Sequence, residues 1–382
     1  MKRRIHVMFE CGADGIPYGA SHIRLLRPLS HPSLQGEFNL TFGTDLPDFV
    51  VDLVILERGW RHDHTLADQS RLLKRLATLG IPYVYEIDDN LLDLNVAPGA
   101  PDYPNSEQRQ IIIRYAKNAA GIIVSTHALK RRMARLNANI HVVGNYLDER
   151  LFDFDYLKRK VDRRRELDNS RLVMGYMGTY SHLEDLLMVV EPLRRFLRAR
   201  RDSVRMEIIG IGDEELVRGL FNDLPVSVVK VPVGRVEYPE FIKWMQREIE
   251  WDFAIAPLVA NEFNDCKSDL KFLDYSLNRI PGIYSATESY TETIADQKNG
   301  LLAAADSNEW AGALNLLTED SEVRQTLSEE AFSYVREFRT LEANAVLWGE
   351  AIEAILTVNL ATKTLGLTAD ENQPLSSISR AL

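Results

Sequence analysis

The sequence predicts an α/β protein with two open parallel sheets in tandem, and three features of the chain predict it. Apolar runs of strand length alternate with amphipathic stretches of helix length, an order typical of parallel sheets with helices on both faces. The aliphatic run at residues 49–57 is typical of a strand covered on both faces. The alternation stops in the charged segment 148–170 and then restarts. A length of 382 residues suits two domains of roughly 150 residues each.

The first half of the chain is expected to form the first sheet. Gly80 ends an amphipathic helix, and Asp88 and Asp89 end the strand that follows it. Strands are expected at residues 4–9, 49–57, 81–87, 121–125 and 140–143, and helices at residues 19–29, 66–79, 106–119 and 127–136.

The second half repeats this order. Gly178 and Gly210 each follow a strand and precede a helix. Strands are expected at residues 172–177, 205–209, 226–231, 253–256, 280–285 and 300–303, and helices at residues 183–201, 214–222, 238–248, 268–277, 309–317, 322–338 and 341–356.

These elements divide the chain into five parts. We expect a first domain at residues 1–150, a charged linker at 151–170, a second domain at 171–338, a terminal helix packing back on the first domain at 339–360, and a polar, disordered tail at 361–382. The carboxyl ends of both sheets should then face one cleft between the domains, where open α/β sheets bind ligands.

The composition excludes several other classes of protein. Hydrophobic residues make up 45% and charged residues 26% of the chain, the balance of a globular protein and not of a disordered or fibrous one. The 45 basic and 56 acidic residues give a net charge of −11, which argues against a nucleic-acid partner. Cys11 and Cys266 are too far apart in sequence to indicate a clustered metal site or a disulfide framework.

The sequence also predicts a cytoplasmic location. No apolar run approaches the roughly 20 residues that span a bilayer, and the first residues do not resemble a signal peptide. Basic clusters at residues 130–135, 158–165 and 194–201 leave two alternatives open. They are either solvated faces or a peripheral contact with the anionic inner face of the membrane, where each basic residue contributes on the order of 1 kcal/mol.

Two lysines near position 270 are the first candidates for chemistry. On a helix, Lys267, Lys271 and Asp274 fall on one face. The lysines, the free N–H groups of the first helical turn and the positive end of the helix dipole would together bind a diphosphate. Asp274, one turn further on, could accept hydrogen bonds from ribose hydroxyls. A solvated helix face with mixed charges is the alternative.

Residues 267–275 (KSDLKFLDY) and 279–285 (RIPGIYS) together resemble the donor-binding signature of GT-B glycosyltransferases, a lysine-bearing helix followed by proline and an apolar strand. The resemblance is closest to the group 1 (family 4-like) retaining enzymes and covers roughly residues 1–340. It includes the stretches 142–146, 175–182 and 207–212. It implies two Rossmann-like domains in tandem, the GT-B fold.

The resemblance also implies a function. A sugar would pass from a nucleotide-diphosphate donor on the second domain to a glycan, lipid-linked or other hydroxyl acceptor on the first, with retention of anomeric configuration and with no cofactor or metal. Three residues are expected to be catalytic: Asp88, His182 and Lys271. The expected donor-binding residues are Gly19, Arg24, Gly178, Thr179, Gly210, Gly212, Val233, Lys267, Ser268, Lys271 and Asp274.

The chain departs from the family pattern at two places. Such enzymes carry two glutamates eight positions apart, whereas here Asp274 matches the second and Cys266 lies near the first. The Arg and Lys that many relatives place after the first strand of the second domain are replaced by residues 178–182 (GTYSH). Phosphate neutralisation would then fall to Lys267, Lys271 and backbone amides.

Several of these candidates have structural alternatives. His182 would lie over the donor phosphates or sugar, or it caps a helix. Gly210 and Gly212 would form a phosphate loop or a plain tight turn. The loop carrying Gly19 would face the diphosphate or is merely flexible. The backbone around Val233 would hold the nucleobase.

Asp88 ends a strand at the position where relatives often carry a histidine beside the transferred sugar. A carboxylate there would orient the acceptor hydroxyl or stabilise positive charge on the sugar. Because Asp89 is adjacent, one of the two carboxyl groups should have a raised pKa. A metal site or a helix cap is the alternative.

Two other functions remain open. One is a nucleotide-sugar 2-epimerase, which shares the architecture but needs carboxylate and histidine acid–base groups near the sugar. The other is a non-catalytic component of a polysaccharide assembly complex that binds a sugar nucleotide or a glycan.

Overall fold

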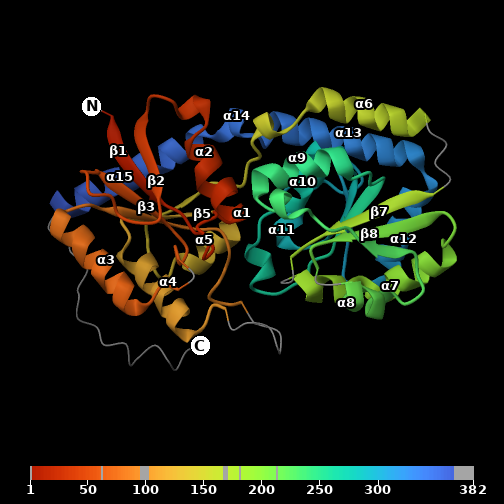
Figure 1. The fold of residues 1–382 in the computed structure, drawn as a ribbon, viewed down its shortest axis with the longest axis horizontal. Coiled ribbons are helices and arrows are strands. Elements are labelled where there is room, and N and C mark those ends of the chain that lie inside the picture. The colour runs from red at the N-terminus through yellow and green to blue at the C-terminus, as the bar shows by residue number, and fades with distance from the viewer. Residues whose placement is uncertain are drawn as a thin grey trace.

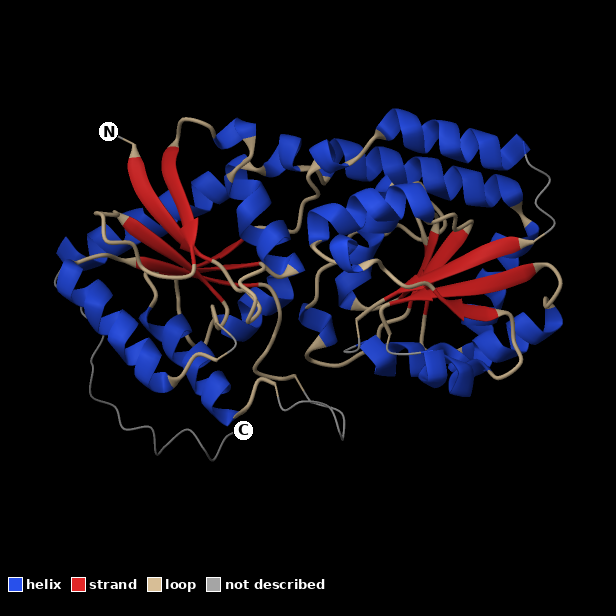
Figure 2. Ribbon diagram, viewed as in Figure 1, coloured by secondary structure: helices blue, strands red, loops and turns tan. Residues whose placement is uncertain are grey.

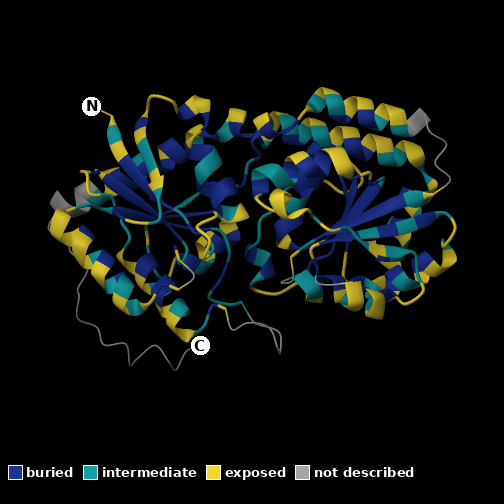
Figure 3. Ribbon diagram, in the orientation of Figure 1, coloured by how far each residue is buried: buried dark blue, intermediate teal, exposed yellow. Residues whose placement is uncertain are grey.

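The computed structural model describes residues 2–61, 63–94, 103–166, 171–179, 182–211 and 214–364. Within them, two six-stranded sheets lie side by side, each with helices on both faces (Figures 1 and 2). Every pairing of neighbouring strands is parallel. The inner strands of both sheets are largely buried and the outer helix faces are exposed (Figure 3). The predicted fold class, two Rossmann-like domains in tandem, is confirmed.

The first sheet has the strand order β2-β1-β3-β4-β5-β6. Its strands are β1 (Arg3–Met8), β2 (Phe38–Gly43), β3 (Leu53–Glu57), β4 (Tyr83–Ile87), β5 (Gly121–Val124) and β6 (Ile140–Val142). The helices of this half are α1 (Gly19–Ser21), the π-helix η1 (His22–Leu26), α2 (Arg27–Leu29), η2 (Pro32–Leu34), α3 (Leu66–Leu79), α4 (Ser106–Asn118), α5 (His127–Met133), η3 (Glu149–Leu151) and α6 (Phe154–Glu166).

The second sheet has the order β12-β11-β10-β7-β8-β9. Its strands are β7 (Leu172–Met177), β8 (Val204–Ile209), β9 (Val226–Val228), β10 (Phe253–Ala256), β11 (Gly282–Ser285) and β12 (Leu301–Ala303). The helices of this half are α7 (Leu183–Ala199), α8 (Glu214–Phe221), η5 (Val233–Arg235), α9 (Tyr238–Glu248), η6 (Asn264–Cys266), α10 (Leu270–Leu277), α11 (Glu288–Thr291), α12 (Ser307–Glu319), α13 (Ser321–Phe338), α14 (Leu341–Asn344) and α15 (Val346–Thr364).

The C-terminal helices return to the first sheet. Trp348, Ile352 and Ile355 of α15 share a buried cluster with residues of β1, β3, β4 and β5. Figure 1 shows α15 in blue beside the red and orange first half of the chain. Residues 361–364 belong to α15, contrary to the predicted disorder, and the rest of the predicted tail lies outside the described residues. No helix in the described part of the chain is long and apolar enough to cross a bilayer.

The charged segment predicted as a linker contains helix α6. Charge density suggested an irregular segment, but one face of the helix is buried. Leu157 is 1% exposed, and the rings of Phe154 and Phe332 lie 5.6 Å apart. Lys160 donates a hydrogen bond of 2.8 Å to the carbonyl of Gln246 in α9.

A glycine in β7 is required by packing. A Cβ at Gly175 would lie 1.8 Å from the indole of Trp251, which is itself buried. Gly175→Ala is therefore expected to lower the free energy of unfolding by about 1–3 kcal/mol, the usual cost of overpacking a core. Chemical denaturation measures the change.

Gly219→Ala in α8 is the matched control for this substitution. A Cβ there meets no heavy atom within 4 Å, so alanine should leave stability unchanged or raise it by about 0.5–1 kcal/mol. Equal effects of the two substitutions would contradict the packing argument.

Candidate active site

A cavity of about 510 Å³ lies between the two halves, at the carboxyl ends of both sheets. Ten of the residues singled out by the sequence line it: Gly19, Asp88, Gly178, Thr179, His182, Gly210, Lys267, Ser268, Lys271 and Asp274. Both lysines thus face a cleft, so the alternative of a solvated helix face does not hold.

The start of helix α10 is open toward this cleft. Asp269 occupies the N-cap position, but its side chain makes no capping hydrogen bond. Both of its carboxylate oxygens instead accept hydrogen bonds from Arg339, at 2.7 and 2.8 Å. The first N–H groups of a helix have no partner within the helix. The amide end of α10 and its positive dipole therefore remain available to an anion in the cleft.

Two lysines flank the ring of His182. Lys267 Nζ lies 3.4 Å from Nε2, and Lys271 Nζ lies 3.3 Å from Nδ1. Burial, followed by the charges of Lys271 and Lys267, lowers the pKa of His182 to about 3, so the ring is neutral near pH 7. Burial, followed by the charge of Lys267, lowers the pKa of Lys271 to about 7. Three basic side chains therefore lie close together, and an anionic ligand would stabilise positive charge on them.

Asp185 fixes the orientation of His182. Its Oδ2 lies 2.7 Å from His182 Nδ1, and its Oδ1 accepts hydrogen bonds from the Val259 amide and the Asn264 side chain. Burial alone would raise the pKa of Asp185, but the hydrogen bonds from His182 and Val259 lower it overall. His182 stands at the N-cap of α7 without capping it, because its side chain is turned to this cluster.

Asp274 lies deeper in the same wall of the cleft. It is 4% exposed, and the Tyr238 hydroxyl donates to its Oδ1 over 3.5 Å. Burial raises its pKa to about 7. A carboxyl group so weakly hydrogen-bonded can still accept from a ligand hydroxyl.

The first domain supplies a carboxylate pair and an arginine. Arg58 Nε donates to Asp88 over 2.6 Å, and Arg58 Nη2 donates to Asp89 over 3.2 Å. Burial, followed by the charge of Asp88, raises the pKa of Asp89. Because the guanidinium already donates to an oxygen of each carboxylate, this arrangement does not favour the metal-site alternative.

Among the cleft residues that sequence reasoning missed are Arg58, Asn145 and Tyr238. Arg58 directly follows strand β3 and lines the cleft, so its position after a strand was the available signal. Asn145 follows β6 and donates to Ser268 Oγ over 2.7 Å, which joins the two halves. Tyr238 is the first residue of helix α9, and no sequence pattern marked it as a site residue.

Arg24 was expected to contact the donor, but the structure buries it beneath the cleft. It is 1% exposed and pairs with Glu86 at 2.7 Å. It also donates to the Val143 carbonyl and to Asn145 Oδ1, so it holds Asn145 in place. A donor contact through its side chain is ruled out by this burial.

Two further expected donor residues are not placed at the cleft, for different reasons. Val233 is 90% exposed and does not line the cleft, whereas Val231 and Val236 on either side of it do. Gly212 lies outside the described residues.

Gly178 and Gly210 pack against each other. Gly210 has a φ of +85°, and a Cβ there would lie 2.4 Å from the Gly178 carbonyl oxygen. A Cβ at Gly178 would lie 3.1 Å from the Cβ of His182. Glycine is therefore required at position 210, where two strand ends meet, and Gly178 is only tightly packed; this favours the tight-turn alternative at Gly210.

Cys266, near the position of the family's first glutamate, packs in the apolar cluster of the first domain. It is 5% exposed, and burial raises its pKa to about 11. Its carbonyl accepts a hydrogen bond of 2.9 Å from Thr126. The residue joins the two halves and carries no negative charge near pH 7.

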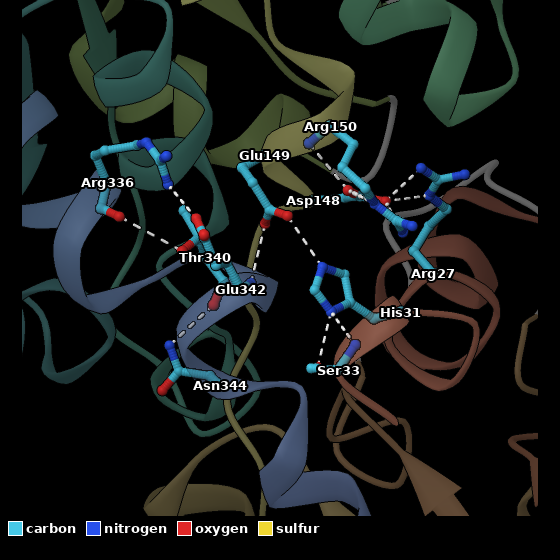
Figure 4. A network of polar contacts seen from close by, with 10 residues as sticks. All are labelled: Arg27, His31, Ser33, Asp148, Glu149, Arg150, Arg336, Thr340, Glu342 and Asn344. Carbon is cyan, nitrogen blue, oxygen red and sulfur yellow. Dashed lines mark hydrogen bonds and ion pairs between the residues drawn. The ribbon is translucent and has the colours of Figure 1, made fainter. Parts of the chain in front are cut away.

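Among the described residues, one group has donor atoms close enough to hold a metal ion: His31, Asp148 and Glu149. Asp148 is already paired with Arg27 and Arg150, and Glu149 accepts from His31 and from the Glu342 amide (Figure 4). With their oxygens engaged by cationic and N–H donors, these residues form a polar network between the halves and do not fit a metal centre.

No protein-family model and no curated protein matches the chain. Among solved structures, a sucrose-phosphate synthase from Thermosynechococcus elongatus is 12% identical over 93% of this chain and 100% of its own, with a TM-score of 0.65. HepE from Anabaena, solved with UDP and glucose, is 14% identical over 96% and 100%, with a TM-score of 0.59. A UDP-forming trehalose-phosphate synthase from Burkholderia xenovorans is 11% identical over 94% and 99%, with a TM-score of 0.58.

At these identities the likeness establishes the fold alone, and the function has to be argued from the residues of the cleft. Each of the three neighbours is aligned over nearly its whole length, so both domains and their relative order are shared. The chain therefore has the GT-B fold of these glycosyltransferases.

Proposed function

We propose that the protein is a retaining glycosyltransferase that uses a nucleotide-diphosphate sugar. The observation that carries the proposal is the convergence of Lys267, Lys271 and the open amide end of α10 on one cleft. HepE, a structural neighbour, has been solved with UDP and with UDP-glucose, which supports a nucleotide-sugar donor for this cleft.

Each group in the cleft has a separate role in the proposed transfer. Lys267, Lys271 and the amides of α10 bind the diphosphate and stabilise the negative charge that grows as it leaves. The bond from the anomeric carbon to the diphosphate oxygen breaks, and the acceptor oxygen forms its bond to that carbon on the same face. The acceptor proton passes to the departing phosphate oxygen. Asp88, held by Arg58, orients the acceptor hydroxyl. Because protein cations offset the leaving-group charge, we propose no metal or cofactor.

Contacts across the cleft support a closed state that excludes water. His22 Nε2 lies 2.9 Å from Glu237 Oε1, and Arg132 lies 2.8 Å from Glu262. Closure of this kind protects the donor from hydrolysis before an acceptor is bound.

The acceptor proposed is a glycan rather than a membrane lipid. Several residues of the basic clusters are engaged within the protein: Arg131 with Glu288, Arg132 with Asp93, and Arg164 with Asp252. Their charges are less available to an anionic bilayer, which weakens the case for peripheral membrane contact.

A 2-epimerase is less favoured by the same cleft. That reaction needs a histidine able to donate and accept a proton near the sugar. With a pKa of about 3, His182 stays neutral near pH 7 and is a poor proton donor.

Two assays test the proposal in sequence. Thermal-shift measurements with UDP, GDP, ADP and TDP identify the base, because a specific ligand raises the melting temperature by mass action. Mass-detected transfer from the corresponding sugar nucleotides to a panel of glycans then tests catalysis. Transfer with retained configuration is expected. Binding without transfer or hydrolysis would favour a non-catalytic binding component.

Donor binding is expected to depend on pH through Lys271. A bound diphosphate stabilises the charged amine, so binding raises the pKa of Lys271 from its value of about 7 and takes up a proton at higher pH. The affinity for the diphosphate should fall by up to about tenfold per pH unit between about pH 7.5 and pH 9. Titration calorimetry in buffers of different ionisation enthalpy measures both effects.

Lys271→Arg provides the control for this pH dependence. The guanidinium keeps its charge throughout this range, so the variant should bind with little change in affinity as the pH rises. A wild-type profile as flat as that of the variant would contradict the assignment.

A further inference from the structure

A second, smaller cavity of about 250 Å³ lies in the first domain beside the main cleft. It is formed at the carboxyl end of the first sheet by the residues after β1, the residues after β3 and the start of α4. Its walls include Glu10, Tyr18, Arg58, Arg61, Tyr103 and Gln108. No described residue of the second domain lines it.

Arg58 lines both cavities. One edge of its guanidinium donates to Asp88 over 2.6 Å, and Nη1 lies 3.4 Å from Glu10 in the small cavity. Tyr18, which lines the small cavity, directly precedes Gly19, which lines the cleft. A molecule in the small cavity would therefore lie next to Asp88, the residue assigned to the acceptor hydroxyl.

The small cavity contains a buried carboxylate, that of Glu10, which can accept hydrogen bonds from a ligand. Glu10 is 3% exposed, and both side-chain contacts of its carboxylate, with Arg58 and with the Tyr103 hydroxyl, are 3.4 Å long. Contacts of that length exceed the 2.7–3.2 Å of a normal hydrogen bond, so the carboxylate retains capacity for a ligand. Burial is also the main cause of the raised pKa of Glu10.

Aromatic and charge properties define the ligand further. Tyr18 and Tyr103 are 43% and 37% exposed, so they present aromatic surface that can pack on the apolar face of a ring. Glu10, Asp88 and Asp89 surround the single charge of Arg58, and Arg61 is paired with Asp63 at 3.3 Å. This balance disfavours an anionic ligand. The volume is below the range of about 300–1,000 Å³ typical of drug-sized ligands, which suits one ring.

We propose that this cavity binds one neutral sugar ring of the acceptor, with Glu10 accepting its hydroxyls and Tyr18 and Tyr103 packing on its faces. The proposal rests on the proposed glycosyl transfer and names its acceptor class. The ring belongs either to a free monosaccharide or to the terminal residue of a glycan. Glu10 and Tyr18 then determine acceptor affinity and not donor affinity.

Ligand-observed NMR on the full chain, saturated with the best-binding nucleoside diphosphate, tests this directly. The probes are methyl glycosides of glucose, galactose, mannose and N-acetylglucosamine, the corresponding disaccharides, and glucose 1-phosphate as an anionic comparison. At least one neutral glycoside should bind in the presence of the nucleotide, and glucose 1-phosphate should bind more weakly. Tighter binding of a disaccharide indicates a glycan terminus, and equal binding indicates a free sugar.

Two variants and one control separate a specific site from a general effect. Tyr18→Ala and Glu10→Gln should each weaken glycoside binding by about tenfold or more, the loss expected for a strong polar or aromatic contact. Phe42→Ala removes an exposed aromatic ring that lines neither cavity and should change nothing.

The outcomes distinguish this proposal from the proposed function. Nucleotide binding without any neutral glycoside binding, or glycoside binding that survives both substitutions, overturns the acceptor site alone. Failure of all nucleoside diphosphates to bind overturns the donor assignment, and with it the basis of the acceptor site.

Discussion

Replacing Lys271 with methionine is expected to weaken nucleoside-diphosphate binding by about 10- to 100-fold, the loss of one charge-assisted hydrogen bond. Lys271 lines the cleft beside the amide end of α10, and its amine lies 3.3 Å from His182. Within the described residues, Lys267 is the other cation of this cluster, so the substitution removes one of the two lysine charges that face the diphosphate. Titration calorimetry near pH 7 measures the change.

Stability separates this loss of function from a loss of structure. Burial disfavours the charged form of Lys271 in the folded protein, as its lowered pKa indicates. Methionine removes that cost, so the melting temperature of the free protein should stay the same or rise. Lys243→Met removes a surface lysine that pairs with Glu240 and does not line the cleft, so it should leave nucleotide affinity unchanged. A variant at position 271 that binds like wild type would contradict the diphosphate site.

Replacing Arg339 with methionine is expected to destabilise the protein by about 3–5 kcal/mol, because it leaves the buried carboxylate of Asp269 without its partner. The guanidinium makes two hydrogen bonds to Asp269, at 2.7 and 2.8 Å, and one of 3.3 Å to the Asn145 carbonyl. The side chains are only 15% and 5% exposed. Chemical denaturation measures the loss.

The same substitution should also weaken nucleotide binding, because freed Asp269 places a negative charge at the start of α10. Arg336→Met is the matched control. Arg336 pairs with Glu342 on the surface at 2.9 Å, with 39% and 64% of the side chains exposed, so its loss should cost less than about 1 kcal/mol. Similar losses in both variants would contradict the buried role of Arg339.

The parts of the fold that could be predicted are those whose sequences show a strong apolar pattern. Strands such as β3 and β4 are buried at every position, and apart from one glutamate each their residues are aliphatic or aromatic. Strand β2 was missed because it lies at the sheet edge and buries only Phe38. Helix α6 was missed because its charged face outweighs the few side chains that it buries.

The candidate site could be predicted where function coincides with the end of a strand or the start of a helix. Lys267, Lys271 and Asp88 occupy such places, and all three line the cleft. Arg24 could not be told from a ligand-binding arginine, because its burial depends on Glu86 and Trp348, which are distant in sequence. Arg58 has a φ of +39°, a backbone conformation that no sequence pattern indicated.

A crystal structure with the tightest-binding nucleoside diphosphate bound tests the assignment of the cleft most directly. We expect at least one oxygen of the distal phosphate within about 2.7–3.2 Å of Lys271 Nζ or of an amide in the first turn of α10. A nucleotide bound elsewhere on the protein, with this lysine cluster and the helix end left without contact to phosphate, would contradict it.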